Sequence, residues 1–200
     1  MLVRDHMSEK TITVQRDTSV SHARSLLRKH RIRQLPVLKG ERLVGIITDR
    51  DLRGADTTQQ SVGELMTAKP AVIRPDAPID EAARVLRTHK IGALPVVEGK
   101  ALIGILSGSD VLDAFVEFCG VLEPTYHLVV SGADGANAKW QVRRVIEQQR
   151  ADLKWIYRDK RSGQVHLRLK TPRVDDVVTA LEAAGFEVST VVAPARRQRA

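Results

Sequence analysis

The sequence has few residues of several types, and each shortage excludes a class of protein. Its 200 residues include one cysteine, Cys119, so no disulfide can form within the chain. No segment approaches the roughly 18 consecutive apolar residues that a membrane-spanning helix needs, so we expect no membrane partner. The opening residues, MLVRDHMSEK, are charged where a secretory signal would be apolar. Together these features predict a soluble, cytoplasmic protein.

Aromatic residues make up only 4% of the chain, which gives little support for stacking on nucleic-acid bases. The apolar stretch AFVEFCGVL predicts that Cys119 is a buried packing thiol. Acidic residues are outnumbered, and the formal net charge of +8 favours anionic partners: nucleic acid, nucleotide phosphates or acidic protein surfaces. Part of the excess lies in a basic tail, residues 194–200, which we expect to be disordered.

Known catalytic motifs are missing as well. The chain has no Walker loop, no nucleophile elbow and no dinucleotide-binding fingerprint. Its histidines lack the short spacing of a zinc site, and one cysteine cannot form a thiolate cluster. We therefore expect a protein that is not an enzyme and that requires no metal for folding.

The most informative feature is an internal repeat with an offset of 59 residues. GIITDRDL at 45–52 aligns with GILSGSDV at 104–111, and LPV at 35–37 aligns with LPV at 94–96, without a gap. A match that holds its register over so many positions indicates two copies of one supersecondary unit. Gly45 and Gly104 open the first pair of motifs, where a glycine permits a tight hairpin or the close approach of a strand or ligand.

Each copy has the periodicity of a β-α-β-β-α unit. A short β-rich run (TITV or AVI) precedes an amphipathic helix that ends near His30 or His89. A hairpin and a short helix follow, with turns at KGE and EGK. Because one copy of about 60 residues buries its apolar face only marginally, we expect the two copies to pack as one module.

These repeated motifs resemble the cystathionine β-synthase (CBS) domain, over residues 1 to about 118. The resemblance implies a first repeat at 1–59 and a second at 60–118. It also implies clefts that bind an adenine nucleotide (AMP, ADP or ATP) or S-adenosylmethionine and so regulate an attached or partner protein.

A hydroxyl followed three residues later by a carboxylate occurs in both copies, as Thr48 with Asp51 and Ser107 with Asp110. This spacing is typical of a helix cap, which needs no ligand. It also suits a nucleotide, because free N–H groups and a hydroxyl at a helix start can bind phosphate and a carboxylate can accept hydrogen bonds from ribose. The resemblance favours the second interpretation: the aspartates would hold ribose and the hydroxyls would contact ribose or phosphate. It also implies that the adenine slots are lined by Ile32 and Ile91.

The copies differ in charge, since Arg33 and Arg50 are replaced by Gly92 and Ser109 in the second copy. A guanidinium binds phosphate in a bidentate way, so the cleft that Arg33 or Arg50 reaches should take the more highly charged nucleotide. Ser109 is included with them as a candidate contact. The alternative is that these arginines are solvated surface residues. If the arginines are only surface residues, Arg33→Ala should leave any preference for ATP over AMP unchanged.

After a linker at 119–125, residues 126–193 predict a βαββαβ order, the ferredoxin-like arrangement of an α+β domain. This order resembles the ACT domain, a regulatory module that often binds amino acids at subunit interfaces. A CBS pair followed by an ACT-like domain is similar to bacterial accessory proteins of acetoin utilisation (AcuB-like proteins). Two residues are candidate caps of the first helix in this domain: Asp134 and Asn137.

The leading hypothesis is a homodimeric, non-catalytic sensor in which an adenosyl ligand shifts the ACT-like domain or a protein partner. The competing hypothesis is a nucleic-acid-binding regulator that uses the basic surface and the Arg-rich tail.

Overall fold

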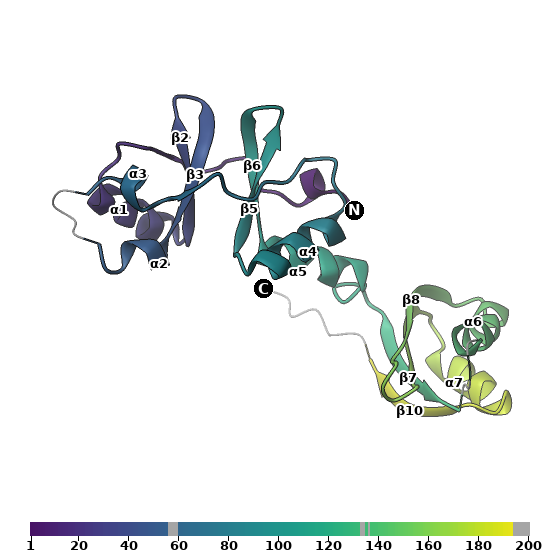
Figure 1. Ribbon diagram of the computed structural model, residues 1–200. Helices are drawn as coiled ribbons and strands as arrows, with labels where there is room; N and C mark the ends of the chain where they lie inside the picture. Colours follow the sequence, from purple (N-terminus) through teal and green to yellow (C-terminus); the bar gives the residue numbers. More distant parts are fainter. Residues whose placement is uncertain (56–59, 133–134, 136, 194–200) are drawn as a thin grey trace. The chain divides into compact units, whose positions relative to one another are not determined.

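The computed structural model describes residues 1–55, 60–132, 135 and 137–193, and the chain divides into two units, Met1–Ala114 and Phe115–Ala200 (Figure 1). The basic tail at 194–200 and the candidate cap Asp134 lie outside the described residues. Within this description, the chain contains no helix that is long and apolar enough to span a membrane.

The first unit contains both copies of the repeat. The first copy contributes η1 (Val3–Asp5), β1 (Val14–Gln15), α1 (Val20–His30), β2 (Gln34–Lys39), β3 (Arg42–Thr48) and α2 (Asp49–Leu52). The second contributes α3 (Val62–Leu65), β4 (Thr67–Ala68), α4 (Ile79–His89), β5 (Ala93–Glu98), β6 (Ala101–Ser107) and α5 (Gly108–Phe118), which continues into the second unit. The helix, hairpin and short helix expected in each copy are therefore confirmed.

The β-rich runs before the helices form less strand than expected. Only Val14–Gln15 of the first copy is a strand, and it pairs in parallel with β2. In the second copy, Ile73 makes a single parallel bridge to Val96. The two pairings are equivalent across the repeat, because Val14 opposes Val37 as Ile73 opposes Val96. The strands of the unit follow the order β1-β2-β3-β6-β5, and β4 pairs with β3.

Each half of the first unit is completed by the opening segment of the other copy. Val3 is fully buried in the core that contains Leu94 and Leu106, and its N–H donates to the carbonyl oxygen of Ala77 at 2.9 Å. In return, Val62 packs in the core that contains Leu35, and its N–H donates to Thr18 at 2.8 Å. Each of the two hydrophobic cores therefore contains residues from both copies of the repeat.

Glycines in the two central strands allow this exchange. A Cβ atom on Gly104 of β6 would lie 2.7 Å from Sδ of Met7 and 3.1 Å from the carbonyl oxygen of Ser8. On Gly45 of β3 it would collide with Sδ of Met66, from the equivalent segment of the second copy. Of the roles considered for these glycines, the structure supports the close approach of a neighbouring segment.

We expect Gly104→Ala to lower the free energy of unfolding of the first unit by about 1–3 kcal/mol, because the added methyl group overpacks the contact with Met7. Gly54→Ala is the matched control, since a Cβ atom there meets nothing within 4 Å. Urea unfolding followed by circular dichroism measures both. Equal midpoints for the two variants would contradict the close-packing argument.

The second unit has the βαββαβ order that the sequence predicts. Its elements are β7 (Tyr126–Ser131), α6 (Ala138–Gln148), β8 (Asp152–Arg158), β9 (Val165–Lys170), α7 (Val174–Ala183) and β10 (Glu187–Val192). The strands form an antiparallel sheet in the order β10-β7-β9-β8, and both helices cover one face of it (Figure 1). Asn137 stands at the N-cap position of α6 but makes no capping hydrogen bond with its side chain.

The segment expected as a linker packs against the second unit. Thr125 is buried, and its hydroxyl donates to the carbonyl oxygen of Gly120 at 2.9 Å and accepts from Nη1 of Arg168 at 3.2 Å. Lys154 forms an ion pair with Glu123 at 3.3 Å. Cys119 is buried as expected, and burial raises the pKa of its thiol, although the nearby Arg168 opposes the shift.

Candidate nucleotide-binding cleft

One cleft in the first unit brings together every binding residue proposed from the sequence. It has a volume of about 1290 Å³ and lies between the two copies of the repeat. The nine proposed residues that line it are Ile32, Arg33, Thr48, Arg50, Asp51, Ile91, Ser107, Ser109 and Asp110. Residues 59 positions apart in the sequence thus face the same space.

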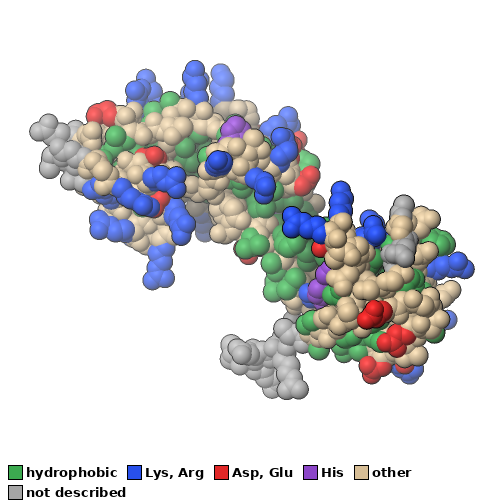
Figure 2. All heavy atoms as spheres, turned by 60° about the horizontal axis from the view of Figure 1, so that its bottom comes forward, with side chains coloured by type: hydrophobic (Ala, Val, Ile, Leu, Met, Phe, Trp, Pro, Cys, Tyr) green, Lys and Arg blue, Asp and Glu red, His purple; other side chains and the backbone are tan. Residues whose placement is uncertain are grey.

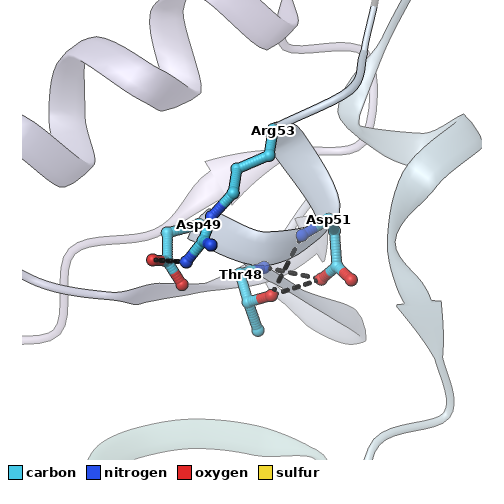
Figure 3. Close-up of polar contacts among 4 residues, drawn as sticks. All are labelled: Thr48, Asp49, Asp51 and Arg53. Carbon is cyan, nitrogen blue, oxygen red and sulfur yellow. Dashed lines mark hydrogen bonds and ion pairs between the residues drawn. The ribbon is translucent and has the colours of Figure 1, made fainter.

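Thr48 and Asp51 form a reciprocal cap at the start of α2 (Figure 3). The backbone N–H of Thr48 donates to Oδ2 of Asp51 at 2.8 Å, and the hydroxyl of Thr48 donates to the same oxygen at 2.7 Å. The N–H of Asp51 donates back to Oγ1 of Thr48 at 3.3 Å. The capping interpretation is therefore correct for the first copy.

Ser107 and Asp110 repeat this arrangement at the start of α5. Oδ2 of Asp110 accepts from the N–H and the hydroxyl of Ser107 at 2.6 and 2.8 Å, and the N–H of Asp110 donates back at 3.3 Å. Among the described residues, Oδ1 of Asp51 and of Asp110 has no hydrogen-bond partner. The cap thus uses one oxygen of each carboxylate and leaves the other available to a ligand.

The starts of α2 and α5 have fewer free hydrogen-bond donors for a phosphate than the sequence suggests. The N–H of Asp49 donates to the carbonyl oxygen of Arg33 at 2.9 Å, and the N–H of Gly108 donates to Gly92 at 3.0 Å. With the N–H of the capping aspartate also bonded, two of the first three amides in each helix are occupied. The hydroxyl hydrogens of Thr48 and Ser107 are donated to the neighbouring aspartates too, so each helix start keeps few donors for an anion.

Cations that the sequence analysis missed can supply that binding. The cleft is lined by six Lys and Arg side chains and three carboxylates. Besides Arg33 and Arg50, the cations are Lys10, Arg31, Lys69 and Lys90. An available signal was the repeat itself, because its offset pairs Lys10 with Lys69 and Arg31 with Lys90. Figure 2 shows many Lys and Arg side chains, and few Asp and Glu, on the surface of this unit.

Three of these cations stand at an unfavourable backbone conformation. Arg31, Lys69 and Lys90 have φ values of 53°, 49° and 53°, in the left-handed region that glycine adopts most easily. Arg31 and Lys90 occupy the C-cap positions of α1 and α4. A non-glycine residue in this region costs roughly 1–2 kcal/mol relative to glycine. Arg150, outside the cleft, has the same conformation, so the conformation alone does not identify a binding residue.

Arg53 does not belong to the cleft lining. Its Nη2 forms an ion pair with Oδ2 of Asp49 at 3.2 Å, on the exposed side of α2 (Figure 3). Among the described residues, no group of three or more His, Cys, Asp or Glu side chains is suited to hold a metal ion.

The chain belongs to the CBS domain family, whose model matches residues 3–57 and 62–117. It is 42% identical over 101 residues to an inosine-5'-monophosphate dehydrogenase of Korarchaeum cryptofilum, covering 50% of this chain and 21% of that enzyme. The matched region is thus about a fifth of the length of that relative. The mixed α and β fold of a CBS pair is the class that the sequence predicts.

Two similar structures contain adenosyl ligands. The CBS pair of protein MJ0100, solved with 5'-methylthioadenosine and S-adenosyl-L-methionine, is 31% identical with a TM-score of 0.55, covering 58% of this chain and 97% of that one. CBSX2, known from Arabidopsis thaliana and solved with AMP, is 35% identical with a TM-score of 0.55, covering 58% and 96%.

An AcuB-like relative is also found among the solved structures. An acetoin utilisation protein (AcuB) from Vibrio cholerae is 28% identical with a TM-score of 0.54, covering 58% of this chain and 91% of that one. The similarity to AcuB-like proteins expected from the sequence is thus confirmed for the CBS pair.

Ser107→Ala should lower the free energy of unfolding by about 1 kcal/mol, because the N-terminus of α5 loses its capping hydroxyl. Ser109→Ala, two residues further on, is the control, since it removes a hydroxyl that makes no capping bond within the described residues. Thermal unfolding without ligand measures the difference, and no difference between the two variants would contradict the assigned cap.

Proposed function

We propose that this chain is a non-catalytic sensor that binds an adenine nucleotide in the cleft between its two CBS repeats. The observation that carries the proposal is the pair of capped aspartates, each with one unbonded carboxylate oxygen, facing a single cleft rich in cations. The ligands named in the AMP and S-adenosylmethionine complexes of similar proteins support an adenosyl group.

The ribose would bind at Asp51 and Asp110. A carboxylate oxygen can accept from the 2'- and 3'-hydroxyls of ribose, and the cap holds the other oxygen in place. Thr48 and Ser107 can only accept a further hydrogen bond, because each hydroxyl hydrogen is already donated to the neighbouring aspartate. They orient the carboxylates and can accept from a ribose hydroxyl. Ile32 and Ile91 would lie against the faces of adenine.

The excess of cations favours a ligand with several negative charges. We infer that ADP or ATP binds more tightly than AMP, and that S-adenosylmethionine, with its positive sulfonium group, binds less well. The repeat supplies matched cations on both sides, so each copy can contribute to a polyphosphate site. The arginines at 33 and 50 add to the charge contributed by the first copy.

A ligand in this cleft contacts both copies of the repeat, and therefore favours the arrangement of the two halves that it binds better. We propose that this shift is passed to the second unit, an ACT-like domain, or to a protein partner. The strand order β10-β7-β9-β8 and the two helices on one face support that assignment. The single thiol and a nucleotide ligand suit a cytoplasmic protein.

ATP or ADP should raise the melting temperature of the purified chain more than AMP or S-adenosylmethionine does. A ligand at about 100 times its dissociation constant adds roughly 2.7 kcal/mol to the folded state. Asp51→Ala and Asp110→Ala should each reduce the shift, and Asp113→Ala, an exposed carboxylate of α5 outside the cleft lining, should not. No shift with any of the four ligands would refute the proposed function.

The variant Lys90→Gly should weaken nucleotide binding with little change in the free energy of unfolding. It removes a cation of the cleft while placing glycine at a left-handed C-cap, so the free energy of unfolding should stay within about 1 kcal/mol of wild type. Isothermal titration calorimetry should show weaker ATP binding and a smaller ratio of ATP to AMP affinity. Unchanged nucleotide affinity in this variant would show that Lys90 does not contribute to nucleotide binding.

We also propose that the protein is a homodimer. On α5, Leu112, Phe115 and Phe118 are spaced three residues apart on one side of the helix and are 59%, 57% and 60% exposed. Phe115→Glu should convert a dimer to a monomer of 22.2 kDa in light scattering, while Glu117→Gln on the same helix should not. A monomeric wild-type protein would exclude this part of the proposal.

A further inference from the structure

The face of the C-terminal sheet opposite α6 and α7 carries an ordered set of rings. Residues of β7 and β9 alternate between the two faces, and the helix side takes Leu128, Val130 and Leu167. The opposite face has two rows that cross three strands. The first row is His127, Arg168 and Trp155, and the second is Val129, His166 and Tyr157.

Four of these six side chains are aromatic, and they contact one another. Trp155 and Tyr157 are stacked, with centroids 6.1 Å apart and ring planes 15° apart. His127 lies 6.4 Å from Trp155, edge to face, and 5.6 Å from His166. The side chain of Tyr157 is on the surface, and the residue is 48% exposed. The rings form a continuous platform across β7, β9 and β8.

The histidine at one end of this platform favours its neutral form. Burial, Arg168 and His166 all lower the pKa of His127 below its usual value. A neutral imidazole is a flat ring on which a base can stack without the desolvation of a charge.

The hairpin that carries most of the platform is basic. Residues 152–170 include six Lys and Arg and only two carboxylates. Both carboxylates are already engaged: Asp152 pairs with Lys154 at 3.0 Å, and Asp159 accepts from the N–H groups of Arg161 and Ser162 at 2.6 and 3.4 Å. The surroundings of the rings therefore favour an anion.

The positive charge of this face also argues against its packing on the same face of a second copy of the chain. Two such faces packed together would bring Arg168 and the basic hairpin residues against their own equivalents, at a cost in repulsion. A ligand that combines flat rings with regularly spaced negative charges matches both properties of this surface. Unpaired nucleotides have that combination.

We propose that this open sheet face binds single-stranded nucleic acid, with bases stacked on Tyr157, Trp155 and the two histidines, and phosphates held by Arg168 and the basic hairpin. Residues 120–125 border one end of the face, where Gly120 lies close to the side chains of Arg168 and Lys154. The proposed site consists of described residues of the second unit and shares no residue with the lining of the nucleotide cleft.

The test uses the full chain and fluorescein-labelled 12-nucleotide single strands of RNA and of DNA, with the duplex of the same sequence. Fluorescence anisotropy should show tighter binding of a single strand than of the duplex, and the better of the two single strands identifies the sugar. Tyr157→Ala should weaken that binding about fivefold or more, since stacking on one ring is lost. Arg161→Ala should lower the slope of log affinity against log salt by about 0.7.

Matched controls lie on the helix side of the sheet. Trp140→Ala removes a 60% exposed tryptophan of α6, and Arg143→Ala removes an exposed cation of the same helix. Neither should change affinity or salt slope. In a Trp140→Phe background, Trp155 is the remaining tryptophan, so its fluorescence should be quenched by the oligonucleotide even if Tyr157→Ala fails to fold.

Equal affinity for single strand and duplex, equal losses in Tyr157→Ala and Trp140→Ala, or unquenched Trp155 fluorescence would each overturn the proposal. Absence of binding at low salt would overturn it as well. None of these outcomes bears on nucleotide binding in the cleft between the repeats.

Discussion

The first unit depends on the exchange of opening segments between the two repeats. Residues before each helix leave their own copy and complete the core of the other, and they can do so because a glycine in each central strand leaves room for a methionine. Among the described residues, the central strands β3 and β6 of the two halves pair at one position, Arg42 with Ala101. The cleft between them is therefore held by segments that belong to both copies.

The two interpretations of the hydroxyl and carboxylate pairs are compatible in this structure. The cap uses one oxygen each of Asp51 and Asp110, and the other oxygen stays available to the proposed ligand. Because the cap fixes the carboxylate before any ligand arrives, little side-chain entropy remains to be lost on binding. Helix capping and the proposed ligand recognition thus involve the same two residues without competing for the same atoms.

Much of the fold could be predicted from the sequence, because the repeat and the periodicities report local structure. The helices ending at His30 and His89, and the βαββαβ order after residue 125, follow from these patterns. The exchange of segments could not be predicted. Two copies aligned without a gap look the same whether each opening segment packs on its own copy or on the other one. The lining of the cleft was predicted in part: charge differences drew attention to Arg33 and Arg50. Lys69 and Lys90 were missed although the repeat pairs them with Lys10 and Arg31, because the sequence does not show that their backbone is left-handed.

The exchange also bears on the order in which the protein can assemble during synthesis. Ser8 forms reciprocal backbone hydrogen bonds with Ile105, about 100 residues later in the chain. At a synthesis rate of roughly 5–20 residues per second, the segment around Ser8 waits about 5–20 s for its partner strand. The first half, by contrast, is complete once the segment around Val62 has emerged. The first half therefore has all of its segments available before the second half does, and the cleft, which needs both halves, is the last part of the module that can be completed.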